Sequence, residues 1–180
     1  MMDINIFKTY LSKTPSYVGG KSVAEIQTSA DQIYKLSSNE NALGSSPKAI
    51  EAIQKHCTSL SDYPERTDAT LRQLLSTHYD DLLAPEQYMV TPSGSEMIDL
   101  LARAFLEPGL SAIVSSPCFK PYSMFSENMG AHIVDIRLKD SDFSLDIDRI
   151  VQSIDSKTRL LFLASPNNPT GSYIPRNTLD

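Results

Sequence analysis

Cysteine and histidine are scarce in this chain of 180 residues. There are two cysteines, Cys57 and Cys118, and neither belongs to a CxxC pair or to a cluster of cysteine and histidine. The three histidines, at positions 56, 78 and 132, are scattered. Zinc sites and disulfide frameworks both need such residues at close, regular spacing. The sequence therefore predicts reduced, structural cysteines and no metal site.

Clusters of positive charge and long apolar runs are also missing. The net charge is −6 and the sequence pI is about 5.0. No run of Lys and Arg is dense enough to neutralise a series of phosphates, which argues against nucleic acid as a partner. The N-terminus carries an early acid, Asp3, and no apolar segment has the length of a signal peptide or of a membrane span. We expect a cytoplasmic protein without nucleic-acid or membrane partners.

Two glycine-rich nucleotide motifs are absent as well. The chain contains neither GxxxxGK[ST] nor GxGxxG, so a nucleotide polyphosphate is not favoured as a ligand. With 41% hydrophobic and 21% charged residues, the composition is that of a soluble globular protein. The length suffices for one domain with a real core and is short for a two-domain enzyme.

Helices and strands alternate in the sequence pattern. Helices are predicted to start near Pro47, Leu71, Met97, Tyr122 and Ile147, with Ser46, Thr67 or Asp68, and Ser144 as candidate caps. Short apolar runs predict strands at 88–90, 112–114, 132–138 and 160–164. This alternation predicts an α/β fold with a mostly parallel sheet and helices on both faces.

Three polar turns follow the predicted strands, at residues 91–95, 115–119 and 165–171. Parallel strands carry their C-terminal ends to one edge of the sheet, and ligands of open α/β sheets bind beyond that edge. We therefore expect the three turns to meet there.

Each turn has a functional interpretation and a simpler one. Ser93-Gly94-Ser95 at a helix start offers hydroxyls and unpaired amides to a phosphate, or is merely a capped turn. Phe119 either stacks on a planar ligand or packs in the core. Asn168 carries an amide that can donate to an oxyanion, held by the stiff Pro169, or belongs to a plain turn.

Taken together, the motifs resemble those of fold-type I pyridoxal-phosphate-dependent aminotransferases, and most closely the histidinol-phosphate aminotransferases. The sequence departs from the family pattern at Ala42 and Ser45, where the family often has proline, and at Phe119, where tyrosine is frequent. The stretches that carry the resemblance span nearly the whole chain in family order: KLSSNENALGSSPKAI (35–50), DYPERTDATLRQLL (62–75), VTPSGSEMIDLLARAF (90–105), SSPCFKPYSMF (115–125) and LASPNNPTG (163–171).

The resemblance implies a role for five residues and a cofactor, pyridoxal 5'-phosphate (PLP). Gly94 and Ser95 would hold the cofactor phosphate, Phe119 would stack on the pyridine ring, and Asn168 would hydrogen-bond the ring's phenolic oxygen. Tyr63 would reach the cofactor phosphate of a neighbouring subunit, which implies a homodimer of the full-length protein.

The resemblance also predicts how the chain is organised. Residues 1–45 would form an N-terminal arm and substrate-side segment, and residues 46–180 an incomplete PLP-binding large domain of a fold-type I transferase. The family's Schiff-base lysine, its aspartate for the pyridine nitrogen and its arginine for the substrate carboxylate all follow the Asn-Pro-Thr-Gly turn. No lysine of this chain is therefore nominated as catalytic, and we expect a truncated chain that is inactive alone.

The function implied by the resemblance is transfer of an amino group between a small amino compound, such as histidinol phosphate, and a 2-oxo acid, 2-oxoglutarate. Two alternatives stay open. One is a PLP enzyme of the threonine-phosphate decarboxylase type, which shares the cofactor turns. The other is a non-catalytic remnant that binds phosphate weakly or serves as an interaction half-domain.

Overall fold

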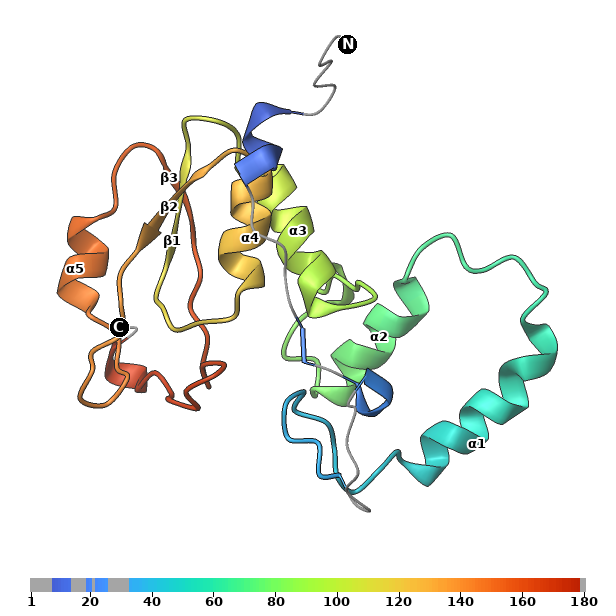
Figure 1. Ribbon diagram of the computed structural model, residues 1–180. Coiled ribbons are helices and arrows are strands. Elements are labelled where there is room, and N and C mark those ends of the chain that lie inside the picture. Colours follow the sequence, from blue (N-terminus) through green and yellow to red (C-terminus); the bar gives the residue numbers. More distant parts are fainter. Residues whose placement is uncertain (1–7, 14–18, 21, 26–32, 179–180) are drawn as a thin grey trace, which may run out of the picture. The chain divides into compact units, whose positions relative to one another are not determined.

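A computed structural model of the protein describes residues 8–13, 19–20, 22–25 and 33–178 (Figure 1). The chain divides into two compact units. One is Val18–Val90, and the other combines Thr91–Asp180 with Met1–Tyr17. Much of the predicted arm, residues 1–45, lies outside the described residues. The division of the chain after residue 45 stays a prediction.

The unit Val18–Val90 contains the two helices predicted there, α1 (Pro47–His56) and α2 (Ala69–His78). Proline stands at the first helical position of α1, where its missing N–H costs nothing. Ser46 and Asp68 are the N-cap residues, but neither side chain makes a capping hydrogen bond. Asp68 instead forms an ion pair with Arg72, at 2.9 Å between Oδ1 and Nε.

The strand predicted at residues 88–90 does not form. A strand is stable only beside a neighbour that completes its hydrogen bonds, and the described part of this unit contains no other strand. The Val90 amide donates instead to Asp68 Oδ2, at 3.3 Å. The turn at residues 91–95 therefore follows an irregular segment and not a strand, which corrects the prediction.

The second unit is built on a three-stranded parallel sheet. Its strands are β1 (Ser111–Val114), β2 (His132–Asp135) and β3 (Thr158–Leu161), in the order β2-β1-β3. All three coincide with predicted strands, although β2 and β3 end earlier than their apolar runs. The predicted parallel α/β architecture is confirmed.

Helices cover both faces of this sheet (Figure 1). On one side lie α3 (Gly94–Phe105) and α4 (Pro121–Asn128), and on the other lies α5 (Ile147–Gln152). Each face of the sheet has its own core, and β1 contributes to both because successive side chains of a strand point to opposite faces. Ala112 packs with Ala102 and Leu106 of the α3 side, whereas Ile113 packs with Ile150 of α5.

Local chemistry sets where these helices begin and end. Ser93 caps α3, with its Oγ accepting from the Glu96 amide at 3.2 Å. Asp146 caps α5 in the same way, accepting from the Arg149 amide at 3.2 Å. The prediction that Ser144 caps this helix was therefore wrong by two residues. The remaining helical segments are short 3-10 turns at Thr9–Lys13, Val23–Glu25, Cys57–Ser59, Pro85–Gln87 and Arg176–Thr178.

Gly130 closes α4 as predicted, because its φ of +75° lies in the region that favours glycine. A Cβ at this position would lie 2.9 Å from side-chain carbons of Pro108 and Tyr10. Among the helices of the described residues, none combines the length and apolar character that crossing a bilayer requires.

Candidate cofactor site at the strand ends

The start of α3 has backbone amides that face open space. The first bond of the helical ladder runs from the Met97 amide to Ser93 O, at 3.2 Å, so the amides of Gly94 and Ser95 precede it and have no partner within the helix. Gly94 is exposed, and a Cβ built on it meets no atom within 4 Å. Free amides, the positive end of the helix dipole and open space together fit a phosphate group.

The turn after β1 carries Phe119 on an aromatic row. Phe119 is half-buried, and its ring makes a T-shaped contact with Tyr122 of α4, with centroids 5.7 Å apart. Tyr122 in turn stacks on Phe162 at the end of β3, with centroids 4.8 Å apart and planes 16° from parallel. Phe119 thus stands at the outer end of the row, where a partly exposed ring can contact a planar ligand.

The turn after β3 is closed by its own backbone. The Asn167 amide donates to Ser172 O at 2.7 Å, and the Gly171 amide donates to Asn167 O at 2.8 Å. Gly171 has a φ of +72°, which glycine adopts without steric cost. Asn168 lies exposed in this turn, and within the described part of the chain its side-chain amide has no hydrogen-bond partner. That amide is available to a ligand.

Three hydrogen bonds that involve side chains connect the strand ends to one another. Asn167 Nδ2 donates to Pro117 O across 3.0 Å and so joins the turn after β3 to the turn after β1. Asp135, the last residue of β2, accepts from Ser116, at 3.0 Å from its amide and 2.7 Å from its hydroxyl. The turn that carries Phe119 is therefore attached on both sides.

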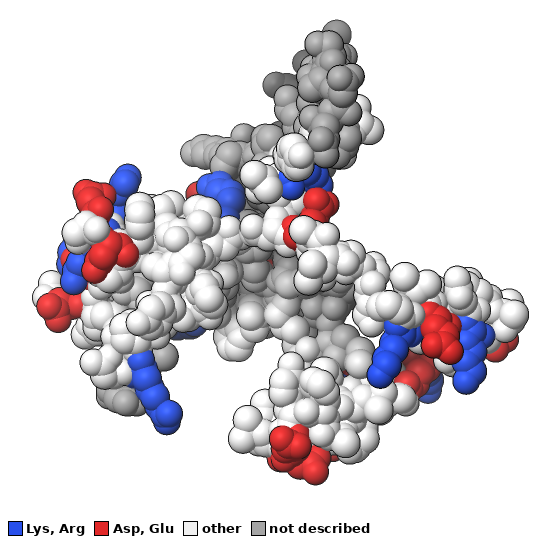
Figure 2. All heavy atoms as spheres, turned by 90° about the horizontal axis from the view of Figure 1, so that it is seen from below, with Lys and Arg blue, Asp and Glu red and all other residues white. Residues whose placement is uncertain are grey.

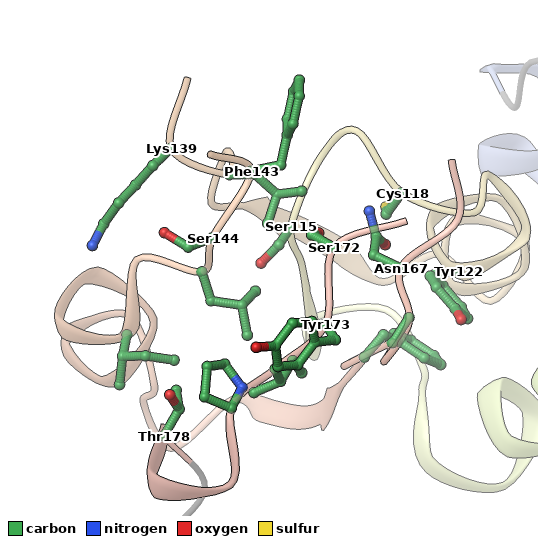
Figure 3. Close-up of a pocket in the computed structure, with 17 residues that line it drawn as sticks. Ser115, Cys118, Tyr122, Lys139, Phe143, Ser144, Asn167, Ser172, Tyr173 and Thr178 are labelled. Atoms are coloured by element: carbon green, nitrogen blue, oxygen red, sulfur yellow. The ribbon is translucent and has the colours of Figure 1, made fainter. Parts of the chain in front are cut away.

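A cavity of about 270 Å³ lies over the C-terminal ends of the three strands (Figure 3). Its lining includes the hydroxyl groups of Ser115, Ser144 and Ser172, whereas the Lys139 amine in Figure 3 points away from it. Ser115 is 5% exposed, and its Oγ has no hydrogen-bond partner. Buried hydroxyls rarely stay unpaired, so this one marks the cavity as polar on its inner side.

The five residues predicted to bind the cofactor differ in their relation to this edge. Phe119 and Asn168 lie on the two connected turns, next to the cavity-lining residues Cys118 and Asn167, but do not line the cavity themselves. Gly94 and Ser95 belong to the same compact unit, although no hydrogen bond among the described residues joins the start of α3 to either turn. Tyr63 belongs to the other unit, where it is 91% exposed. Whether these residues share a ligand stays a prediction.

Sequence reasoning did not single out Asn167, Ser115 or Asp135. Asn167 belongs to the Asn-Asn-Pro-Thr-Gly turn, but nothing in the sequence distinguishes its role from that of Asn168. Ser115 and Asp135 each stand where a strand ends, the usual place for functional side chains in parallel sheets. This position at a strand end is the only sequence signal that points to Ser115 and Asp135.

Burial shifts the pKa of two ionisable groups at this edge. Burial raises the pKa of the Cys118 thiol, and the nearby Asp135 carboxylate raises it further. Burial, followed by the proximity of Cys118, raises the pKa of the Tyr122 phenol. Both shifts favour the uncharged forms of the thiol and the phenol. In the described part of the chain, no group of three His, Cys, Asp or Glu side chains could hold a metal ion.

On the face shown in Figure 2, Lys and Arg side chains stand near Asp and Glu side chains and do not gather into one patch. This face therefore offers no extended positive surface to a polyanion.

Comparison with known proteins identifies a common family. The family model "Aminotransferase class I and II" matches residues 31–180. Histidinol-phosphate aminotransferase of Methanothermobacter thermautotrophicus is 37% identical over 168 residues, which are 91% of this chain and 44% of that protein. The enzyme of the same name from a Geobacillus species is 35% identical over 175 residues, or 96% of this chain and 47% of that protein. The chain thus spans a little under half the length of these relatives.

Solved structures agree with this result. An alanine aminotransferase from Pyrococcus furiosus superposes with a TM-score of 0.66 and 27% identity, covering 72% of this chain and 35% of that structure. A mutant aspartate aminotransferase from Thermus thermophilus gives a TM-score of 0.76 over 98% of this chain and 46% of its own. At 22% identity, the second likeness concerns the fold alone.

Proposed function

The chain belongs to the class I and II aminotransferase family, and on that premise we propose that it supplies the cofactor-binding part of a PLP-dependent aminotransferase. The observation that carries the proposal is the family match over residues 31–180, which includes all three polar segments of the candidate site. A PLP enzyme of the threonine-phosphate decarboxylase type and a non-catalytic remnant are the alternatives, and the test below separates the remnant from a cofactor-binding part.

The geometry supports a division of labour among this chain's residues. The amides of Gly94 and Ser95 would hold the cofactor phosphate at the start of α3. Phe119 would lie against the pyridine ring, and the free amide of Asn168 would donate to its phenolic oxygen. When bound, PLP supplies an electron sink, and this chain's residues set its position and orientation.

We propose histidinol phosphate as the amino donor and 2-oxoglutarate as the acceptor. The relatives that are 37% and 35% identical to the chain bear the name histidinol-phosphate aminotransferase, which supports this choice. We further propose that the full-length protein is a cytoplasmic homodimer in which Tyr63 reaches the phosphate site of the partner subunit. The 91% exposure of Tyr63 is consistent with such a role.

A chimeric enzyme tests the proposal. Residues 1–180 would replace the matching part of the Methanothermobacter relative, so that the chimera has a complete family length. The expected result is glutamate production from histidinol phosphate and 2-oxoglutarate, measured by coupled oxidation of the product. Because the relative supplies the second half of the chimera, this result tests the cofactor-binding role of residues 1–180 and not the choice of substrate. Failure of the folded chimera to retain PLP would favour the remnant.

The 180-residue chain alone is expected to be inactive. In a matched assay with the same substrates, it should produce no glutamate, because no lysine of the chain stands at a motif for covalent attachment of the cofactor. Turnover by the purified chain would overturn this part of the proposal.

A further inference from the structure

The turn that carries Phe119 is held by two neighbouring strand ends. On the β2 side, Asp135 accepts both hydrogen bonds from Ser116. On the β3 side, Asn167 Nδ2 donates to Pro117 O at 3.0 Å. Phe119 follows Pro117 by two residues, and Asn168 follows Asn167 directly. One hydrogen bond therefore connects the segments that carry the proposed ring-stacking residue and the proposed oxygen donor.

We propose that Asn167 is a positioning residue, which sets the placement of Phe119 relative to Asn168. This inference rests on the proposed function, because the placement of Phe119 relative to Asn168 matters only if both residues contact the cofactor. The hydrogen bond itself and its effect on Phe119 are independent of any ligand.

The chemistry of the site requires an amide at position 167. Its Nδ2 carries two hydrogens, and the structure gives it two acceptors, Pro117 O at 3.0 Å and Thr170 Oγ1 at 2.8 Å. Thr170 Oγ1 lies 2.8 Å from Ser172 Oγ, so the contact continues into the backbone-closed turn. An aspartate has nearly the same shape but accepts only, and it would place its charge against the Pro117 carbonyl.

Two asparagine-to-aspartate substitutions distinguish the loss of the hydrogen-bond donor at position 167 from a general effect of an added negative charge. Asn167→Asp removes the donor and leaves the side-chain volume unchanged. Asn177→Asp makes the same chemical change at an exposed position of the same compact unit, outside the cavity lining. Asn167→Ser removes the amide without adding charge, in case the aspartate variant does not fold. Circular dichroism and urea unfolding establish which variants are folded.

The first measurement needs no ligand. The chain is labelled with 4-fluorophenylalanine, and the Phe119 signal is assigned by its loss in Phe119→Leu. The ring of Tyr122, 5.7 Å away, should displace this signal from the value of an unfolded chain. In Asn167→Asp or Asn167→Ser, the Phe119 signal should shift toward the unfolded value while the signal of the core residue Phe125 stays. An unchanged Phe119 signal in both folded variants would overturn the inference.

The second measurement is affinity for pyridoxamine 5'-phosphate, which lacks the aldehyde that reacts with surface lysines. We expect Asn167→Asp to weaken binding about tenfold, the effect of losing one well-oriented hydrogen bond. Asn177→Asp should have no effect on this affinity.

The two measurements fail differently. If the unaltered chain does not bind pyridoxamine 5'-phosphate, the proposed function is contradicted, while the fluorine signal still decides whether Asn167 positions Phe119. If the chain binds and the Asn167 variants bind equally well, the positioning role is contradicted and the proposed function stands.

Discussion

The rings of Tyr122 and Phe162 lie stacked, with centroids 4.8 Å apart and planes 16° from parallel. Tyr122 belongs to α4, and Phe162 directly follows β3. The contact therefore joins a helix on one face of the sheet to the strand end from which the Asn-Asn-Pro-Thr-Gly turn departs. It stabilises the edge of the sheet at which we place the cofactor.

The stacked pair should contribute measurably to stability. Phe162→Ala removes both the ring contact and apolar area packed against the α3 side of the core. Because the side chain is half-buried, we expect a loss of about 2 to 3 kcal/mol in the free energy of unfolding, at the low end for buried phenylalanines. Phe162→Leu, which retains most of the apolar volume, should lose less than half as much. Equal losses for both variants in urea titrations would contradict the packing role.

Two glycines should respond oppositely to the same substitution. Gly171→Ala should cost about 1 kcal/mol in the free energy of unfolding, because the φ of +72° is unfavourable for alanine. Gly94→Ala should leave stability unchanged or slightly raised, since its Cβ meets no atom within 4 Å. We expect the added methyl group to crowd a phosphate bound at the free amides of α3, so affinity for pyridoxamine 5'-phosphate should fall. If Gly94→Ala binds pyridoxamine 5'-phosphate as tightly as the unaltered chain, the start of α3 is not part of the cofactor site.

Asp155 should make stability depend on pH in the acid range. The backbone amide of Lys157 donates to the Asp155 carboxylate and is the main cause that lowers the pKa of Asp155 below its usual value. The hydroxyl and the amide of Thr158 also donate to this carboxylate and lower its pKa further. A carboxyl whose folded pKa is lowered stabilises the fold above its unfolded pKa of about 3.9, and this contribution is lost as the pH falls through the folded value. Asp155→Asn should therefore be less stable than the unaltered chain at pH 7.

The stability difference between Asp155→Asn and the unaltered chain should shrink below about pH 4, as the aspartate becomes protonated. Urea midpoints recorded between pH 7 and pH 2.5 check this expectation. A difference that is constant over the whole range would show that the charge of Asp155 is not involved.

Cys118 should react slowly with alkylating reagents. Since the thiolate is the reactive form, the raised pKa of Cys118 and its partial burial both reduce the rate. Cys57 is exposed and provides an internal reference in the same chain. With iodoacetamide at pH 8, mass spectrometry of the peptides should show Cys57 modified first, and urea should abolish the difference. Faster alkylation of Cys118 in the folded chain would contradict its neutral, packed state.

Much of the fold was predictable because the signals are local. The apolar runs around Ile113 and Leu160 and the helical spacing from Met97 to Phe105 report burial along one element at a time. These signals identified β1, β3 and α3. The N-cap of α5 was less predictable. Ser144 and Asp146 are both good cap residues, and only the final path of the chain selects Asp146.

The remainder depends on contacts between distant residues. The strand expected at residues 88–90 needs a neighbouring strand to complete its hydrogen bonds. The three residues themselves carry no signal of whether such a neighbour exists, and the described part of their unit contains none. The hydrogen bond from Asn167 to Pro117 joins residues 50 positions apart. The sequence indicated the chemistry of each turn, whereas the connection between the turns follows from the sheet order.

The most direct test of a shared cofactor site is a titration of the isotopically labelled chain with pyridoxamine 5'-phosphate, followed by amide resonances. The account predicts that the amides of Gly94, Ser95, Phe119 and Asn168 shift together and give one dissociation constant. Shifts restricted to other residues, or separate dissociation constants for α3 and the two turns, would contradict it.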